Sequence, residues 1–125
     1  MTRIAALRAV GELAGCSDGE ISSLLRYTDE VDVPAGTVVA VRERLCSAFV
    51  VVLEGSLQAG CAQLGPGDSF GWDAMWERTA NLATVVAESD ARLLVMSHDQ
   101  FRAIKGLVPP RVTTLPGKLR VPAAA

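Results

Sequence analysis

The stretch Gly65-Pro66-Gly67-Asp68-Ser69-Phe70-Gly71-Trp72-Asp73-Ala74-Met75-Trp76, followed by Asn81-Leu82-Ala83-Thr84-Val85-Val86-Ala87, decides the fold of this chain. It predicts a glycine-rich turn, then a short helix beginning near Trp72, then a β-branched strand. Glycine adopts backbone angles that other residues resist, and it lets a ligand approach the main chain closely. A helix beginning near Trp72 would point its first N–H groups into the turn, which suits an anion. The sequence therefore predicts a phosphate-binding turn.

Two short helices are predicted before the strands. Apolar residues recur at helical spacing between Ile4 and Leu13, and Gly15 can close this first helix. Ser17-Asp18-Gly19-Glu20 has the pattern of a capping box, in which the serine and glutamate side chains satisfy each other's backbone donors. A second helix is expected from there through Leu25.

The middle of the chain predicts short strands separated by glycine turns. The expected strands cover residues 31–33, 37–41, 48–53, 56–59, 61–64, 83–87 and 91–96. Ser97-His98-Asp99-Gln100 is a second capping box, and Phe101–Leu107 has one apolar helical face that Pro109-Pro110 ends. The pattern predicts a mainly β fold with flanking α: a jelly-roll-type β-barrel with short N-terminal helices and a C-terminal helix. Residues 1–110 are expected to form this domain, and residues 111–125 are expected to be an extended or disordered tail.

Size and composition restrict the function. A chain of 125 residues with 50% hydrophobic and 21% charged residues is one globular domain. A net charge of −2 supplies no basic field for nucleic acid or an anionic membrane. No apolar run reaches the roughly 18 residues that a membrane span needs. The three cysteines lack CxxC spacing and are odd in number, which favours a reducing cytoplasm over a disulfide framework.

Together these segments resemble the cyclic nucleotide-binding domain family, in particular the catabolite-activator-like effector domains. Phe70-Gly71-x-x-Ala74 with Ala83-Thr84-Val85 is similar to the family's phosphate-binding cassette. Val33–Thr37 is similar to its opening strand and turn, and Phe49–Ser56 to its central strand and glycine turn. The resemblance covers roughly residues 13–108 and implies a domain that binds cAMP or cGMP.

Two positions depart from that pattern. The glutamate that holds the ribose hydroxyl in the family is replaced by Trp72, and the arginine that pairs with the cyclic phosphate is replaced by Asn81. A hydrogen bond to a charged group contributes about 1.5–3 kcal/mol. We therefore expect weak or no cyclic nucleotide binding, with the Asn81 amide as an uncharged donor.

The expected function is a non-catalytic regulatory or interaction module whose ligand site has degenerated. The alternative is a genuine cAMP- or cGMP-sensing domain with a non-standard cassette. If ligand binding is retained, the expected ligand-binding residues are those of the cassette, which are Phe70, Gly71, Trp72, Asp73, Ala74, Arg78, Asn81, Leu82 and Ala83. The expected partner is a protein or a second copy of the chain, with cyclic nucleotide as the one small ligand considered. No other cofactor, no DNA-binding domain and no membrane is expected.

Several residues allow more than one interpretation. Trp72 and Trp76 lie four apart, so on a helix they share a face that could fill the core or plug the pocket, contact a partner, or stack on a ligand. Asp73 and Arg78 could replace the missing acid and base if the loop path changes; otherwise they are solvated charges.

Catalysis and metal binding find little support in the sequence. His98 is the single histidine and is expected at the surface, so no metal site and no catalytic base are predicted. Cys46, near Arg42 and Arg44, is either a reactive thiol or an inert one. Cys16 and Cys61 are expected in the core or at its boundary.

Overall fold

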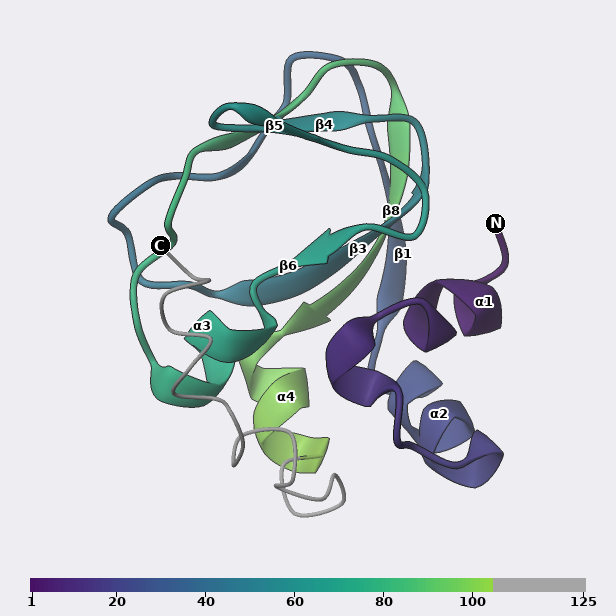
Figure 1. Cartoon of the computed structure of the whole chain (residues 1–125). Helices are drawn as coiled ribbons and strands as arrows, with labels where there is room; N and C mark the ends of the chain where they lie inside the picture. The colour runs from purple at the N-terminus through teal and green to yellow at the C-terminus, as the bar shows by residue number, and fades with distance from the viewer. Residues whose placement is uncertain (105–125) are drawn as a thin grey trace.

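A computed structural model of the protein describes residues 1–104, and predictions about residues 105–125 lie outside that range. Figure 1 shows two β layers, with the helices gathered below the lower one. The elements in chain order are α1 (Arg3–Arg8), the 3₁₀ turn η1 (Gly11–Leu13), α2 (Asp18–Leu25), β1 (Asp29–Val33), β2 (Val38–Ala40), β3 (Ala48–Glu54), β4 (Leu57–Ala59), β5 (Ala62–Leu64), β6 (Ser69–Phe70), α3 (Trp72–Glu77), β7 (Val85–Ala87), β8 (Ala91–Ser97) and α4 (His98–Ile104).

The strands form two four-stranded antiparallel sheets, with orders β1-β8-β3-β6 and β2-β7-β4-β5. The longest pairing joins β3 to β8, from Ala48 opposite Ser97 to Val52 opposite Leu93, before the register shifts. This arrangement matches the predicted jelly-roll fold with flanking helices, and it places β6 and the start of α3 at one end of the sheet that carries β3 (Figure 1).

The strand β3 is buried on both faces, which explains its unbroken apolar sequence. Its side chains alternate between two clusters. Val50 and Val52 lie between the sheets with Leu57 and Leu93. The alternate β3 side chains, Phe49, Val51 and Leu53, point toward the helical layer. There they pack in one cluster with Leu7, Ile21, Leu24 and Phe101 of the helices.

The N-terminal segment differs from the single helix expected between Ile4 and Leu13. The helix α1 ends at Arg8, and Val10 adopts an extended conformation before the 3₁₀ turn. Gly11 explains the break, since glycine loses more conformational entropy in a helix than other residues. Ile4 is 44% exposed as a result, whereas Leu7 and Leu13 are buried.

Both predicted capping boxes are present. Ser17 and Glu20 exchange hydrogen bonds with each other's backbone at the start of α2, and Ser97 and Gln100 do the same at the start of α4. Two strands are shorter than predicted. The strand β2 occupies residues 38–40 of the predicted 37–41, and β7 occupies residues 85–87 of the predicted 83–87. The prediction for Cys61 was wrong: it lies at the turn between β4 and β5 and is exposed.

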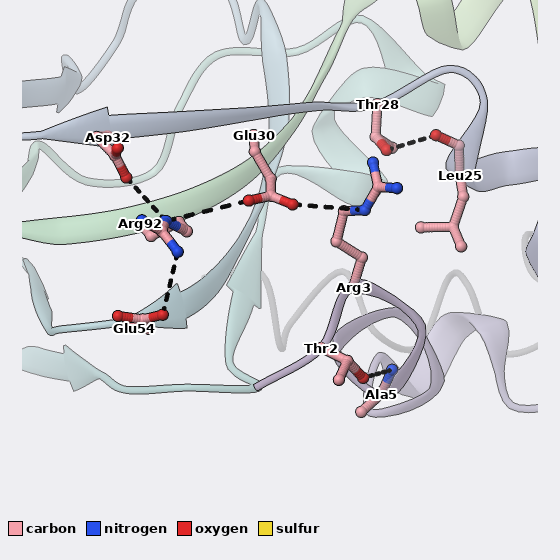
Figure 2. A network of polar contacts seen from close by, with 9 residues as sticks. All are labelled: Thr2, Arg3, Ala5, Leu25, Thr28, Glu30, Asp32, Glu54 and Arg92. Carbon is pink, nitrogen blue, oxygen red and sulfur yellow. Dashed lines mark hydrogen bonds and ion pairs between the residues drawn. The ribbon is translucent and has the colours of Figure 1, made fainter.

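A charge network links β1, β8 and β3 of the first sheet (Figure 2). The Arg92 guanidinium on β8 lies 2.9 Å from a carboxylate oxygen of Asp32 and 3.4 Å from one of Glu54. Glu30 completes the network at 4.0 Å from Arg92 and 3.4 Å from Arg3 of α1. These carboxylates raise the pKa of Arg92, and the hydrogen bond that Arg92 donates to Asp32 is the largest cause. The network joins α1 to three neighbouring strands.

Gly55, after β3, supplies the first testable prediction. Its φ is +87°, and a Cβ there would meet the Asp90 carbonyl oxygen and lie 2.8 Å from the Ala91 Cα. We expect Gly55→Ala to lower the free energy of unfolding by about 1–3 kcal/mol. Gly11→Ala is the control, because nothing lies within 4 Å of its Cβ position; its change should stay within about 0.5 kcal/mol. Urea unfolding followed by circular dichroism measures both, and equal stabilities would contradict the packing described at Gly55.

Candidate ligand-binding site

The turn into α3 depends on Gly71. Its φ is +98°, in the left-handed region, and a Cβ on it would lie 2.5 Å from the Ala48 carbonyl oxygen. Any other residue would therefore push the start of α3 away from β3. Gly71 is the N-cap of α3, and the Met75 N–H donates to its carbonyl oxygen at 3.0 Å. The glycine thus holds α3 against the central sheet.

The helix α3 has two chemically different faces. Trp72 and Met75 are buried in the core cluster beneath the first sheet, and Trp76 packs against that cluster. Asp73 and Glu77 lie four residues apart and therefore share the other face. This second face borders a cavity.

The tryptophans of α3 build an aromatic cluster with neighbouring elements. The Trp72 ring lies 5.0 Å from that of Phe49 and 5.7 Å from that of Phe101, both edge to face. The Trp76 ring lies 5.0 Å from that of Phe101. Trp72 is 2% exposed. Of the predicted alternatives, its indole therefore fills the core and is too deeply buried to contact a partner.

The segment after α3 is fastened to the loop after β2. Backbone hydrogen bonds join Asn81 N–H to the Arg44 carbonyl at 2.8 Å and Glu43 N–H to the Asn81 carbonyl at 3.0 Å. The Asn81 side-chain amide donates to the Val41 carbonyl at 2.9 Å. The Thr84 hydroxyl oxygen accepts from the Arg42 N–H at 3.0 Å. Asn81 therefore has a structural role, since its side-chain amide connects the segment after α3 to the loop after β2.

Between α3, this segment and the strands lies a cavity of about 410 Å³. Its lining consists of Glu12, Ala59, Ser69, Phe70, Gly71, Trp72, Asp73, Ala74, Glu77, Thr79, Ala80, Asn81, Leu82, Ala83 and Val85. The only ionisable side chains in this set are three carboxylates, and within residues 1–104 no lysine, arginine or histidine lines the cavity. A volume of this size is typical of small-molecule sites.

The profile of the cyclic nucleotide-binding domain matches residues 30–105, more than half of the chain, and this span contains most of the cavity lining. The chain belongs to the cyclic nucleotide-binding domain family. No curated protein matches its sequence.

Solved structures show the same fold. A cyclic nucleotide-binding-like protein from Brucella abortus is 19% identical with a TM-score of 0.74, over 83% of this chain and 97% of that one. The N-terminal domain of a transcriptional regulator from Streptomyces coelicolor is 20% identical with a TM-score of 0.78, over 94% and 92%. The regulatory domain of Toxoplasma gondii PKA, solved with cAMP, is 21% identical with a TM-score of 0.77, over 95% of this chain and 48% of that one.

The structure brings together nearly all residues that the resemblance assigned to the cassette. Phe70 to Ala74 and Asn81 to Ala83 line the cavity, whereas Arg78 does not. Arg78 ends α3 in the left-handed conformation, and its Nη1 lies 2.6 Å from His98 Nε2 at the start of α4. In this conformation the Arg78 guanidinium connects α3 to α4 instead of facing the cavity. The partner of the guanidinium is the His98 imidazole.

Sequence reasoning missed two of the three carboxylates. The helical spacing from Asp73 would have pointed to Glu77, because residues i and i+4 share a face. Glu12 had no such signal, since η1 reaches the cavity only through tertiary packing. Among the described residues no group of three histidine, cysteine or acidic side chains could hold a metal ion.

Cys46 is the inert thiol of the two alternatives considered. It is 2% exposed, and its Sγ lies 3.4 Å from the Ala48 carbonyl oxygen and 3.7 Å from that of Gly71. Burial raises the pKa of the Cys46 thiol and is the largest effect on it. The hydrogen bond to the Ala48 carbonyl acts in the opposite direction and lowers that pKa by less. The nearby arginines of the sequence therefore do not activate it.

Thiol labelling tests this environment. A raised pKa leaves less thiolate at a given pH, so Cys46 should react slowly with iodoacetamide at about pH 7 and faster at about pH 9. Cys61, which is exposed, serves as the internal reference and should be alkylated first at both pH values. Mass spectrometry of the digested protein measures each site. Alkylation of Cys46 ahead of Cys61 near neutral pH would contradict the burial described.

Proposed function

We propose that this domain is a non-catalytic regulatory or interaction module whose ligand site has weak or no affinity for cyclic nucleotide. One observation carries the proposal: the cavity at the cassette is lined by three carboxylates and, within residues 1–104, by no cationic side chain. A cyclic phosphate carries a negative charge, so this lining opposes it in a partly enclosed site where charges are less screened than in water.

The regulatory part of the proposal rests on how α3 is joined to α4. Trp72 and Trp76 both pack edge to face on Phe101, and Arg78 contacts His98. Occupation of the cavity would therefore displace α4 along with α3, because both helices share one packed cluster. By resemblance to the family, this is the route by which a ligand changes the position of the C-terminal helix.

A protein partner or a second copy of the chain is the proposed receiver of that change. Val38, Val41 and Leu45 are 55%, 38% and 52% exposed and line a smaller hollow of about 200 Å³. Phe70 and Asn81 border both hollows, and Leu82, at 61% exposed, lines the larger one. An exposed apolar rim of this kind is a common feature of interaction sites.

A genuine cAMP- or cGMP-sensing domain is the alternative. The cavity is large enough for a small ligand, and the PKA regulatory domain with the same fold was solved with cAMP. Arg44 lines the adjoining hollow and would have to turn toward the phosphate to supply the missing charge.

The remaining parts of the proposal follow from the chemistry of the chain. The proposed role is non-catalytic, because the sequence places no base at a recognisable spacing from a nucleophile. None of the helices in residues 1–104 is long and apolar enough to cross a membrane. The three cysteines form no disulfide, and we propose a cytoplasmic location on that basis.

Nucleotide titration tests the loss of affinity. Calorimetry with cAMP and cGMP should show weak or absent binding to the unaltered protein. Asn81→Arg should raise the affinity about ten-fold to a hundred-fold, because a charged hydrogen bond contributes about 1.5–3 kcal/mol. Asn81→Gln is the matched control, since it also disturbs the bond to Val41 but adds no charge. Tight binding by the unaltered protein, abolished by Ala74→Leu, would establish the sensing alternative instead.

Sedimentation velocity tests self-association through the apolar rim. If a second copy is the partner, the sedimentation coefficient should rise with concentration, and Leu82→Ser should remove that rise. Ser56→Ala, away from the rim, should leave it unchanged. A coefficient independent of concentration in all three proteins would exclude the second copy and leave a different protein as the partner.

A further inference from the structure

The strand β1 lies at one edge of the first sheet. Within residues 1–104 its strand partner is β8, and β1 is longer than the other edge strands, which are β2, β5 and β6. Four of its five residues are exposed. The outer side of an edge strand presents backbone N–H and C=O groups that no neighbouring strand pairs, so this side can accept a further strand.

The two faces of β1 differ in chemistry. Glu30 and Asp32 lie on one face, where Arg92 pairs with both (Figure 2), and their side chains remain 41% and 74% exposed. Val31 and Val33 alternate with them and lie on the other face. Val33 packs against the apolar cluster between the sheets, and Val31 is 39% exposed. A strand that fits this edge therefore needs cationic side chains on one face and apolar side chains on the other.

The segment 105–125 has the matching pattern. It contains no acidic residue, and its cations are Lys105, Arg111, Lys118 and Arg120. The rest of the chain is therefore more acidic than the whole, whose net charge is −2. The run Lys118-Leu119-Arg120-Val121 alternates cationic and apolar residues. Pro122 follows it and limits its length as a strand, because proline cannot donate to the ladder.

We propose that β1 is a docking edge and that residues 118–121 of the same chain add to it as a fifth strand of the first sheet. The cationic side chains of this run would lie beside Glu30 and Asp32, and its apolar side chains would cover Val31. Facing residues of neighbouring strands share a face, so the pattern matches whether the added strand runs parallel or antiparallel. Opposite charges and apolar pairs at facing positions stabilise a sheet.

The position of α4 allows the chain to return to β1. This helix follows β8 directly, and Gln100 Nε2 donates to Asp29 Oδ2 at 3.2 Å, so α4 begins beside the first residue of β1. Its seven residues span about 10 Å. Residues 105–117 then connect α4 to the run, and an extended chain spans up to about 3.3 Å per residue. The connection is therefore long enough to bring the run alongside β1.

Zero-length cross-linking of the full chain tests the contact. A carbodiimide joins a lysine amine to a carboxylate where the two touch, and the chain has only two lysines, Lys105 and Lys118. Lys118 should link to Glu30 or Asp32, and added salt should reduce the yield. In a mixture of isotopically heavy and light protein, each linked pair of peptides should come from one chain.

Two cross-linking results would overturn the inference. Lys118 that links only to other carboxylates, or to none, would show that the run does not lie beside β1. Links between heavy and light protein would show that the edge binds a second copy instead of the same chain.

Hydrogen exchange measured by NMR tests the added strand. The outward backbone amides of β1 should be protected, and Leu119→Pro should speed their exchange about ten-fold, the size that a few cross-strand pairs produce. Lys118→Glu should speed it about two-fold to five-fold, because it replaces an exposed ion pair by a repulsion. The matched controls are Thr113→Pro and Arg111→Glu, which make the same kinds of change outside the run and should leave the exchange of β1 unaltered.

Acidic residues also occur on edge strands because they keep those edges unpaired. If that is their whole role here, the outward amides of β1 will exchange rapidly in the unaltered protein and Leu119→Pro will change nothing. That result, or equal effects of the variants and their controls, would overturn the inference. Neither measurement depends on the cavity, so the affinity for cyclic nucleotide is tested separately by calorimetry.

Discussion

The burial of β3 on both of its faces is the constraint on which the rest of the structure depends. A strand whose side chains alternate between two apolar clusters needs a cover on each side. The second sheet covers Val50 and Val52, and the helices cover Phe49, Val51 and Leu53. Each such side chain contributes about 1.5–3 kcal/mol on burial. The helical layer is therefore part of the core, and α3 cannot move without disturbing it.

This constraint explains why the two faces of α3 differ in chemistry. The helix must present large apolar side chains to the core, and Trp72 and Met75 fill that role. The opposite face of α3 carries Asp73 and Glu77, which line the cavity together with Ala74 and part of Trp72. Asn81 likewise serves the fold, because its amide bonds the Val41 carbonyl. The family resemblance implies ligand contacts at positions 72 and 81. In this chain Trp72 packs in the core, and the Asn81 amide connects two loops by a hydrogen bond.

The sequence allowed much of this fold to be predicted, for physical reasons that differ between elements. The apolar run of β3 and the reciprocal patterns at Ser17 and Ser97 are local signals, and the structure confirms all three. The break at Val10 was missed because the apolar spacing continued past Gly11. Cys61 was expected in the strand 61–64, because the local sequence does not decide which two residues form the turn after β4. In the structure Ala59 pairs with Ala62, so Gly60 and Cys61 form that turn.

The candidate site was predictable in outline but not in charge. The cassette residues form a continuous motif, so their proximity followed from the resemblance. The orientation of Trp72 depends on contacts with Phe49 and Phe101, which are far apart in the sequence, and no local pattern reports it. Arg78 turns to His98 for the same reason, since α4 is brought beside α3 only in the folded chain.

The aromatic cluster has one practical consequence. Both tryptophans of the chain lie in it, within ring contact of Phe101 on α4. Indole emission depends on the polarity around the ring, so the tryptophan fluorescence of the protein, excited selectively at long wavelength, reports on the junction of α3 and α4. The chain thus carries its own optical probe, and a shift of its C-terminal helix can be followed without attaching a dye.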